Sequence, residues 1–469
     1  MQEKTQSCPF HAIHNIKEFD ALDPAARENP WPYSDWLRSG ADRRVYKLPQ
    51  EDAIYLLHRY DDVKAALTDA DTFSNKIIPT VKSPFFALTD GKDHQRIRSI
   101  IATFFTPSNL QKREAEVQNV VQTATENLLQ KGRCELFENW AVPIPLGVLA
   151  SMFGLPGHEA SIAKYHHHAV AINRALFVTG GTGPRRSEEP TVAEKAAISF
   201  AIFKNIPRFI KLWKMVGNKG MAELKTMVQF ARKDLATPRP NFEHIPAGLG
   251  PMLELMLLFL EKLKTHKNKD GTDGSDVIAT LNFYHKKGDI SQVEAMMAGA
   301  FILFAGHETV TSLLSNCFVH LARNPATFQE LKAEPGLIEN FVEEMLRFYT
   351  PVGRFLRRTT RAVELNGQSI PKDAIVILML GAANSDAERF ENGCLFDPGR
   401  KNARQHLAFG KGVHFCIGAT LARMQAVAAL KALVGRTSSI AVDETKPLKM
   451  VTDRDNGIFR YEELKVVVK

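Results

Sequence analysis

The sequence predicts a mainly α-helical protein with a minor β-sheet region. Residues 291–323 form a long apolar run with helical periodicity. At ~1.5 Å per residue, such a helix spans ~50 Å, the width of a whole domain. Stretches that alternate between apolar and polar side chains lie near both ends of the chain, for example at 44–48 and 374–380. Because no linker or internal repeat divides the chain, we expect a single domain over residues 31–469, after an N-terminal extension over residues 1–30.

The first half of the chain predicts short strands followed by helices that break at proline and glycine. The strands and one amphipathic segment are expected at 44–48, 53–57 and 60–69. Helical patterns cover 91–129, with breaks at Pro107 and Gly132, and 140–178, broken near Pro143, Pro145 and Gly157. A helical run to about 235 and an apolar run that ends at 267 follow. Polar or proline- and glycine-rich segments predict loops at 179–191, 237–251 and 268–276.

The second half predicts three consecutive helices, then strands, an irregular meander and a last helix. The helices are expected at 291–323, 325–333 and 337–348. Strands follow at 354–365 and 374–380, the meander at 384–408, the last helix at 419–434 and a final strand at 458–468.

Composition and charge place the chain among globular proteins. Hydrophobic residues make up 44% and charged residues 24%, both ordinary values for such proteins. The net charge of +8 indicates either general solubility or a basic face for an acidic electron-transfer protein. Lysine and arginine are dispersed without a basic tract, so we expect no nucleic-acid binding.

Cysteine usage and the N-terminus predict a cytoplasmic protein. The five cysteines are scattered, odd in number and without metal-type spacing, which favours a reducing compartment and no disulfide framework. The first twenty residues contain no apolar signal core. The longest apolar stretch in the middle, 252–260, is too short to span a bilayer, so we expect no transmembrane anchor.

The most informative motif is FGKGVHFCIG, residues 409–418, directly before the last helix. Its glycines allow the backbone to approach a flat partner closely or to take positive φ. A thiolate is favoured at a helix N-terminus by unpaired N–H groups and the helix dipole. A lone cysteine is more often a small buried hydrophobe. The glycine pattern, with Phe409 and His414, instead favours an anionic sulfur of Cys416 presented by a tight loop.

This loop resembles the haem-ligand loop of the cytochrome P-450 superfamily, with every fixed position of that pattern filled. The resemblance covers about residues 30–469 and implies the cytochrome P-450 fold of the soluble, mostly bacterial type. Haem b, iron protoporphyrin IX, is then expected between the long central helix and the helix that follows the loop. Cys416 is expected as the axial ligand of the haem iron, with Phe409 and Gly410 beside it.

The resemblance implies a haem-thiolate monooxygenase that inserts one oxygen atom of O2 into a C–H bond of an apolar, mid-sized or larger organic substrate. No flavin or iron–sulfur domain is fused to the chain, so a separate ferredoxin or flavodoxin with its reductase is expected to supply electrons to a monomer. Epoxidation, ring coupling, desaturation or peroxide-driven oxidation is the alternative within enzymes. A haem-based ligand-binding or sensor protein is the alternative outside them.

A polar group in the long central helix is expected to handle protons. In AGHET, residues 305–309, the Thr309 hydroxyl can donate to the Ala305 carbonyl four residues earlier, which would open a groove over a bound ligand. The segment resembles the oxygen-activation site of the family, with Thr309 and Glu308 delivering protons. His307 departs from the commonly small or acidic neighbour, and we expect the mechanism to be unaffected.

Cationic side chains are expected to hold the two haem propionates. His94 and Arg98 lie one helical turn apart and resemble the propionate pair of the family. Arg357 and His414 match two further positions, and Arg358 would replace Arg357 if the strand register shifted by one.

The substrate pocket is expected from family position, and each of its residues could equally belong to the ordinary core. Its candidates are Phe85, Phe86, Leu88, Phe301, Phe304, Val352, Arg354, Phe355 and Ile458, with Gly353. Arg354 could pair with a substrate carboxylate or with a propionate. Residues 158–250 would form a mobile lid over this pocket.

Three further predictions concern charge. Glu344 and Arg347 lie at i and i+3 on one helix face, and such a pair by itself is usually a solvated ion pair. Here the two residues resemble the family's Glu-x-x-Arg pair, which joins the meander to the core, with Arg400 as the third partner. Four cations are expected on the face where an acidic ferredoxin docks: Arg96, Lys112, Lys411 and Arg423. Residues 166–168, three consecutive histidines, are expected on the surface rather than at a metal, because neighbours diverge around a helix.

Overall fold

The computed structural model describes most of the chain. The described residues are 36–37, 39–40, 43–48, 53–77, 86–176, 192–233, 245–265, 276–443, 445, 448, 450–452, 458–461 and 463–469. The N-terminal extension, Phe85, the loop 179–191 and nearly all of the turn 268–276 lie outside them.

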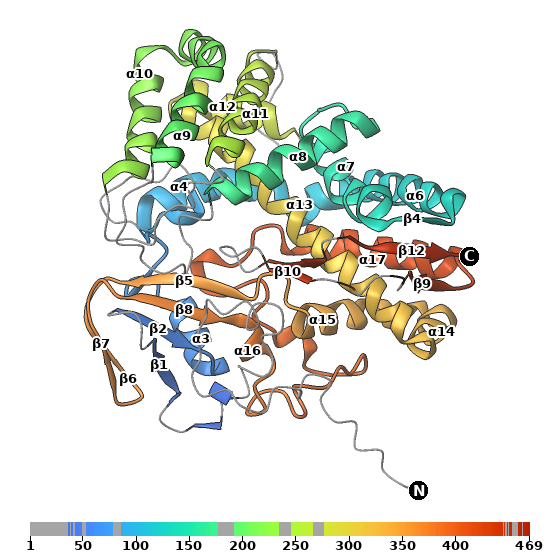
Figure 1. The fold of residues 1–469 in the computed structure, drawn as a ribbon. Helices are drawn as coiled ribbons and strands as arrows, with labels where there is room; N and C mark the ends of the chain where they lie inside the picture. Colours follow the sequence, from blue (N-terminus) through green and yellow to red (C-terminus); the bar gives the residue numbers. More distant parts are fainter. Residues whose placement is uncertain are drawn as a thin grey trace, which may run out of the picture.

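Helices dominate the structure, as predicted, and most of the β-structure lies to one side of them (Figure 1). The helices before the central one are α3 (Tyr60–Thr68), α4 (Gly91–Ala102), α5 (Pro107–Lys112), α6 (Glu114–Lys131), α7 (Pro143–Met152), α8 (Glu159–Leu176), α9 (Val192–Lys204), α10 (Ile206–Lys233), α11 (Ile245–Thr265) and α12 (Val277–Lys287). The central helix and its successors are α13 (Gln292–Arg323), α14 (Pro325–Ala333), α15 (Ile338–Phe348), α16 (Leu380–Asn384) and α17 (Ala419–Arg436).

The largest sheet has the strand order β1-β2-β8-β5-β3 and joins the two ends of the chain. Its strands are β1 (Val45–Lys47), β2 (Ile54–Leu57), β3 (Phe73–Ser74), β5 (Arg354–Thr359) and β8 (Ile375–Met379). β2 and β8 pair in parallel, with Ile54 opposite Ile375, and the other pairs are antiparallel. A three-stranded sheet holds β4 (Arg133–Glu135), β12 (Lys465–Val468) and β9 (Ile440–Val442), and β10 (Met450–Thr452) pairs with β11 (Phe459–Tyr461).

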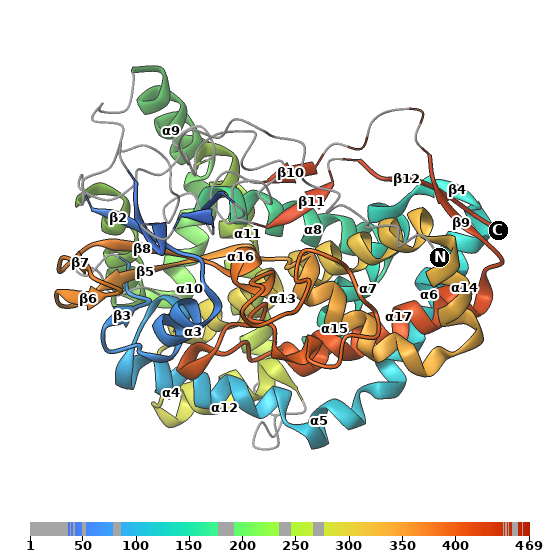
Figure 2. The ribbon, with the colours of Figure 1, turned by 90° about the horizontal axis from the view of Figure 1, so that it is seen from below.

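Two predicted strands are each divided in the structure. The segment 354–365 contains β5 and then β6 (Val363–Leu365), which turns through Asn366 and Gly367 into β7 (Gln368–Ile370). Both turn residues have positive φ, 51° and 77°, as a tight two-residue hairpin turn requires. The tail 458–468 likewise divides into β11 and β12, which belong to different sheets. Figure 2 shows the β6–β7 hairpin at the opposite end of the molecule from β4, β9 and β12.

The central helix α13 is the core of the fold and matches the predicted long helix. Ser291 caps it: its side chain accepts a hydrogen bond from the Glu294 N–H, and the Glu294 carboxylate accepts one from the Ser291 N–H. Among the described helices, α13 alone is long and apolar enough to cross a membrane. The prediction from the sequence concerned the shorter apolar stretch 252–260 and missed this helix. Most side chains of α13 are buried against other helices, so it is a core helix.

The predicted breaks at Pro107 and Gly132 are confirmed, and two other helical predictions need correction. The segment 91–129 holds α4, α5 and α6, because Pro107 starts a new helix capped by the Thr106 hydroxyl. The segment 140–178 follows the unpredicted β4 and a π-helical turn, Phe137–Ala141, and it divides into α7 and α8 around the predicted break at Gly157. The predicted loop 237–251 ends early, because α11 begins at Ile245 with a proline in its first turn.

Candidate functional site

The cysteine loop is folded tightly against its surroundings. The Cys416 N–H donates to the Phe409 carbonyl at 2.8 Å, which closes the loop. Gly410 and Gly412 have positive φ, 68° and 71°. A Cβ on Gly412 would lie 2.7 Å from the Leu67 carbonyl oxygen of α3, so only glycine fits there.

The environment of the Cys416 thiol combines exposure with crowding. The residue is exposed, yet desolvation by surrounding protein atoms raises the pKa of its thiol. The Gly418 N–H and the charges of Arg98 and Arg423 act in the opposite direction and lower this pKa. Gly418 has an ordinary φ of −88° and directly precedes α17, so the thiol lies at a helix N-terminus, where an anionic sulfur is favoured.

Helix α4 is joined to the cysteine loop by Arg98. Its Nη2 donates to the Phe415 carbonyl at 2.6 Å. Burial lowers the pKa of Arg98, and the neighbouring Cys416 raises it. The predicted propionate residue on α4 is therefore beside the predicted axial ligand.

His94 and His414 come together from α4 and from the loop. Their ring centroids are 4.0 Å apart. His94 is 1% exposed, and burial, together with the charges of His414 and Arg98, lowers its pKa to about 4. Within the described residues no hydrogen-bond partner reaches the buried His94 Nε2. This imidazole therefore has a donor or acceptor position available for a bound group.

Asp90 completes this cluster, and sequence reasoning missed it. It stands at the N-cap position of α4 but makes no capping hydrogen bond. Its carboxylate instead accepts from His414 Nε2 at 3.1 Å, from the Asn75 N–H at 3.3 Å and from the Ser74 hydroxyl. Burial raises the pKa of Asp90, but the hydrogen bonds from His414 and Ser74 outweigh it and lower the pKa to about 2. An acidic residue before a helix predicts only a cap, so the sequence contains no signal for this role.

Arg357 brings a buried positive charge to the same place. It is 5% exposed, and Nη1 donates to the Leu356 carbonyl at 2.8 Å. Burial lowers its pKa to about 10, and the nearby Asp90 raises it. No ion pair joins Arg357 to a carboxylate in the described part of the chain. A buried guanidinium without a close counter-ion is costly, so this position fits an anionic ligand.

The register of β5 decides between the two arginines named for this role. Arg357 pairs with Val376 of β8, while Arg358 faces the other side and forms an ion pair with Asp373 at 2.9 Å. Arg358 is therefore not the propionate candidate. Arg354 begins β5 opposite Met379 and is half-buried.

The polar group of α13 has the geometry predicted for it. Thr309 Oγ1 donates to the Ala305 carbonyl at 3.1 Å. Glu308 is buried on the same helix. His307 is buried too, and its Nε2 lies 2.9 Å from His166 Nδ1 on α8. The histidine at position 307 thus connects the predicted oxygen-site segment of α13 to α8, which lies in the region predicted to form a lid.

The surface prediction for residues 166–168 is wrong for two of the three histidines. His167 is exposed, but His166 contacts His307 and His168 is buried 3.2 Å from Glu254 of α11. The three side chains do diverge around the helix, and two of the directions point inward. No cluster of three metal-ligating side chains occurs within the described ranges.

The aromatic pocket candidates form a connected group between α13 and α4. Phe86 lies 5.1 Å from Phe301 and 6.1 Å from His94 between ring centroids, and Phe301 lies 5.9 Å from Phe304. Leu88 is half-buried beside them. This group links the central helix to the imidazole cluster.

A second set of pocket candidates lies around β5. Val352 and Ile458 form an isolated antiparallel bridge, which brings the C-terminal segment to the start of that strand. The Gly353 carbonyl accepts a hydrogen bond from the Gly381 N–H at 3.1 Å. Phe355 lies 3.7 Å from the position of a Cβ on Gly410.

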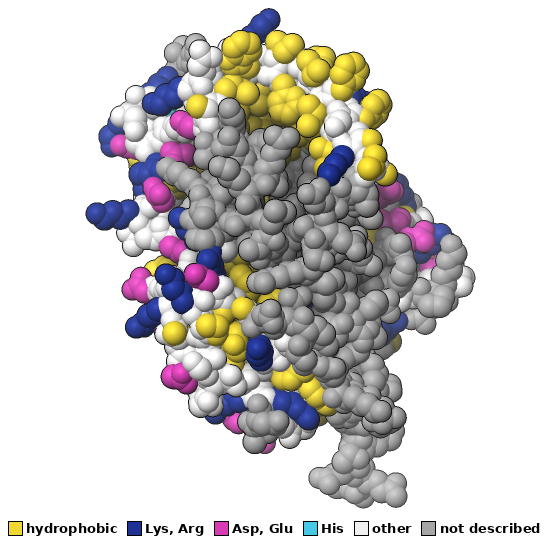
Figure 3. All heavy atoms as spheres, turned by 60° about the vertical axis from the view of Figure 1, so that its left-hand side comes forward, with side chains coloured by type: hydrophobic (Ala, Val, Ile, Leu, Met, Phe, Trp, Pro, Cys, Tyr) yellow, Lys and Arg dark blue, Asp and Glu magenta, His cyan; other side chains and the backbone are white. Residues whose placement is uncertain are grey.

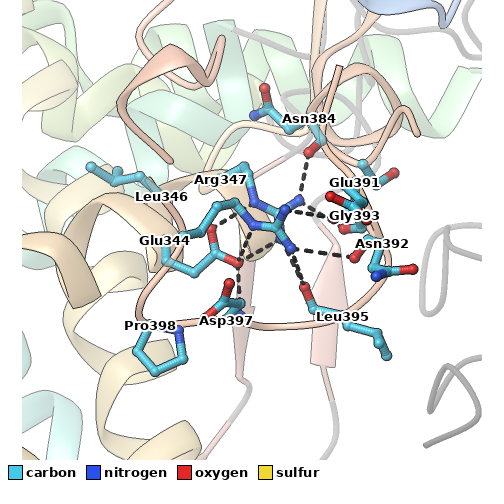
Figure 4. A network of polar contacts seen from close by, with 12 residues as sticks. Glu344, Leu346, Arg347, Asn384, Glu391, Asn392, Gly393, Leu395, Asp397 and Pro398 are labelled. Atoms are coloured by element: carbon cyan, nitrogen blue, oxygen red, sulfur yellow. Dashed lines mark hydrogen bonds and ion pairs between the residues drawn. The ribbon is translucent and has the colours of Figure 1, made fainter. Parts of the chain in front are cut away.

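The Glu344–Arg347–Arg400 network is present, and its three side chains are buried. Figure 4 shows Glu344 and Arg347 beside the backbone of the meander. Arg347 donates twice to Glu344 at 2.7 Å, and Arg400 Nε donates to Glu344 at 3.1 Å. Arg347 also donates to the carbonyls of Asn384, Gly393 and Leu395. These bonds join α15 to the meander, so the solvated-pair alternative is excluded.

The predicted basic face is only partly present. Arg423 donates to the buried Glu343 at 2.5 and 3.0 Å and lies 4.5 Å above the Phe409 ring. Arg96 donates to Glu294 at 2.6 Å. Both cations are neutralised by partners, whereas Lys411 and Lys112 are exposed.

Comparison with known proteins identifies the family. The sequence model of the Cytochrome P450 family matches residues 218–460, more than half of the chain. The chain belongs to this family and is an oxidoreductase whose class carries a haem held by a cysteine thiolate.

The relatives and structural neighbours support the same assignment. Beta-dihydromenaquinone-9 omega-hydroxylase of Mycobacterium tuberculosis is 27% identical, over 92% of this chain and 75% of the relative. The cytochrome P450 monooxygenase PikC of Streptomyces venezuelae is 26% identical, over 91% and 88%. The crystal structure of CalO2 superimposes with a TM-score of 0.75 at 21% identity, over 97% of this chain and 99% of the other. CYP109E1 from Bacillus megaterium in complex with testosterone gives 0.71 at 23%, over 94% and 98%.

Proposed function

We propose that this protein is a monooxygenase that inserts one oxygen atom of O2 into a C–H bond of an apolar, mid-sized or larger organic molecule. Haem b, when bound, supplies the oxygen activation and the redox chemistry. The observation that carries the proposal is the gathering of buried and half-buried cationic and imidazole groups at the loop of Cys416: Arg98 lies beside the thiol, His94 contacts His414, and Arg357 lies near Asp90, which binds His414.

The residues of this cluster fit a haem. Cys416 presents one sulfur at a helix N-terminus and would be the axial ligand. His94 has an available Nε2, and Arg357 is buried without a carboxylate partner among the described residues. Together with Arg98 and His414, these groups would hold the two propionates. Asp90 would fix the orientation of His414.

Thr309 and Glu308 would move protons at the opposite side of the site. The hydroxyl of Thr309 is held at the Ala305 carbonyl and can accept a second hydrogen bond from a bound group or water. Glu308 is a carboxyl on the next position of the same helix, and it would exchange protons with the pocket.

The substrate is inferred from the pocket and from relatives. Phe86, Phe301 and Phe304 present aromatic rings, which favour an apolar molecule. The relative from Mycobacterium tuberculosis is named as the omega-hydroxylase of beta-dihydromenaquinone-9, and this name describes a hydroxylation. We propose hydroxylation as the reaction. Electrons would come from a separate ferredoxin or flavodoxin with its reductase.

The decisive test is the carbon monoxide spectrum of the reduced protein. A thiolate-ligated haem gives a red-shifted Soret band, and Cys416→Ala should abolish it. Cys134→Ala, which removes a half-buried thiol on β4, is the matched control and should leave the band unchanged. If the band survives in Cys416→Ala, the ligand assignment is wrong.

A second test addresses proton delivery. Thr309→Ala should retain haem and substrate binding but divert electrons to hydrogen peroxide, because the hydroxyl that directs protons is gone. The ratio of product to reducing equivalents, measured with a surrogate ferredoxin system, should fall severalfold. Thr311→Ala is the control, since its hydroxyl donates to the Ala141 carbonyl away from this segment. An unchanged ratio in Thr309→Ala would assign the protons to Glu308 or water alone.

A further inference from the structure

An unusual apolar surface covers the outer side of α9 and α10. Seven of the nine large hydrophobic side chains that are exposed among the described residues belong to it: Val192, Phe200, Ile202, Phe203, Ile206, Ile210 and Trp213. Phe203 is 70% exposed and Phe200 67%. Figure 3 shows hydrophobic side chains gathered at the top of the molecule, where Figure 1 places these helices. We call these seven residues the α9–α10 patch.

The patch is not produced by helices that pack poorly, because their other faces are anchored. Ala201, Asn205 and Leu212 are buried. A Cβ on Gly250 of α11 would lie 3.3 Å from Asn205 Oδ1, so the helices approach closely there. Arg208 forms an ion pair with Glu254 of α11.

A second ion pair ties the same two helices together. Lys211 Nζ lies 2.6 Å from Glu261 of α11. The apolar side chains therefore face outward from a fixed base. A contiguous exposed patch rimmed by polar residues marks an interaction surface.

Charge around the patch points to the kind of partner. Residues 192–220 contain six lysines and arginines and one acidic residue, Glu194. Two of the six are the cations paired with α11, and the other four are exposed lysines: Lys195, Lys204, Lys214 and Lys219. A basic rim around an apolar surface attracts an anionic partner and would be repelled by a second copy of itself.

Aromatic anchors and cations on one amphipathic helix pair are the composition of an interfacial membrane segment. Such helices lie in the headgroup region with their apolar face about 5–10 Å deep in the bilayer, and aromatic rings are favoured at that level. Lysine side chains reach anionic headgroups from the rim and are attracted to them electrostatically.

We propose that the α9–α10 patch docks this protein on the surface of an anionic lipid bilayer. Phe200, Phe203 and Trp213 would enter the headgroup–acyl boundary, and Lys204 and Lys214 would contact lipid phosphates. The docking is peripheral and requires no membrane-spanning helix. This proposal rests on the α9–α10 patch and does not depend on which substrate the enzyme oxidises.

Co-sedimentation of the full-length haem-loaded protein with vesicles tests this proposal. Vesicles of phosphatidylcholine with phosphatidylglycerol should bind the protein, pure phosphatidylcholine should bind it more weakly, and added salt should weaken the first interaction. The triple variant Phe200→Ser, Phe203→Ser, Trp213→Ser should bind at least about tenfold more weakly, since three apolar side chains no longer enter the bilayer. Its far-ultraviolet circular dichroism and Soret spectrum should be unchanged because these side chains face outward.

Charge variants separate docking from general attraction of a basic protein. Lys204→Glu with Lys214→Glu should weaken binding by at least about tenfold. Lys372→Glu with Lys401→Glu changes the net charge equally at two exposed positions outside α9 and α10, and it should change binding much less.

Three outcomes would overturn the proposal. One is a failure of the parent protein to bind anionic vesicles, and another is binding that the triple variant leaves unchanged. The third is a dimer of the parent in sedimentation equilibrium that the triple variant dissociates, with no vesicle binding, which would assign the patch to a second copy of the chain.

Discussion

Two clusters of buried charge differ in how their charges are satisfied: one joins α15 to the meander, and the other lies beside the cysteine loop. In the first, Glu344 and Arg347 are both 0% exposed and bind each other, Arg400 and the carbonyls of the meander. In the second, Arg357 and His94 are almost as deeply buried. There, Arg357 donates to one backbone carbonyl and lies 5.8 Å from the centroid of the Phe355 ring, and His94 makes ring contacts with Phe86 and His414.

The difference separates a structural network from a binding site. A buried charge is tolerated when hydrogen bonds and counter-ions surround it, and the Glu344 network meets that condition within the chain. The His94–Arg357 cluster has one carboxylate, Asp90, which is already held by Ser74, Asn75 and His414. Its remaining donors fit an anion that comes from outside the protein. The comparison therefore predicts opposite responses to mutation.

The largest effect is expected from Arg347→Ala. It leaves the Glu344 carboxylate buried without its main partner and releases three carbonyls of the meander, so we expect a loss of about 3–5 kcal/mol of folding stability. Little folded, haem-loaded protein should be recovered, and thermal unfolding of what remains should show a much lower Tm. Arg404→Ala, an exposed arginine 3.7 Å from Glu339, is the control and should change the Tm little. A near-parental Tm for Arg347→Ala would show that the Glu344 network is not needed for folding stability.

Arg357→Leu should spare the fold and weaken the ligand. Removing a buried cation without a close counter-ion relieves desolvation, so the haem-free chain should be at least as stable as the parent. The bound haem loses a propionate contact, and its transfer to apomyoglobin should become about tenfold faster, equivalent to one lost charged hydrogen bond.

The matched control for this variant is its neighbour. Arg358→Leu removes a cation paired with Asp373 on the other side of β5, and it should leave haem transfer unchanged. An unfolded Arg357→Leu chain, or equal transfer rates for both variants, would place Arg357 with the structural network instead.

A pair of cations near the loop sharpens the comparison at the surface. Lys411 is exposed, whereas Arg423 binds the buried Glu343. Lys411→Glu should slow the first electron transfer from an acidic ferredoxin about threefold at low salt and flatten its salt dependence, with an unchanged ferric spectrum. Arg423→Glu would place two carboxylates together and should lower the Tm instead. Stopped-flow reduction across a salt series measures the first effect. An unaltered rate in Lys411→Glu would show that Lys411 does not steer the ferredoxin.

Local spacing explains why much of this site could be predicted from the sequence. Glu344 and Arg347 share a helix face at i and i+3, and the Thr309–Ala305 hydrogen bond follows from helix geometry. The glycines of the cysteine loop indicate backbone positions with positive φ. Each of these signals is contained within a few consecutive residues.

The missed features depend on contacts between distant segments. Asp90 looks like a helix cap, and only the packing of the loop against α4 turns its carboxylate toward His414. Arg423 looks like a surface cation until α17 brings it to Glu343 of α15. His168 was expected on the surface, because the sequence does not show that α11 covers that side of α8.

The smallest effect concerns a buried ionisable group that belongs to neither cluster. His320 of α13 packs on Phe396 with 4.0 Å between ring centroids, and burial lowers its pKa to about 4. The unfolded chain takes up a proton on this imidazole as pH falls through about 6.5, while the folded protein does so only near 4. The stabilisation from keeping His320 neutral is therefore complete above pH 6.5 and is lost progressively between 6.5 and 4. Between about pH 7.5 and pH 6 the expected loss is about 1 kcal/mol or less.

His320→Gln isolates this contribution through its pH dependence. The variant should show a smaller decrease in Tm than the parent when the pH is lowered over that range, whatever its Tm at neutral pH. His167→Gln, which alters an exposed histidine of α8, should keep the parental pH dependence. Identical slopes for the parent and His320→Gln would mean that the folded protein accommodates a protonated His320. Burial alone would then not decide the charge of an ionisable group in this core. The lack of a close counter-ion at Arg357 would therefore no longer indicate a bound anionic ligand.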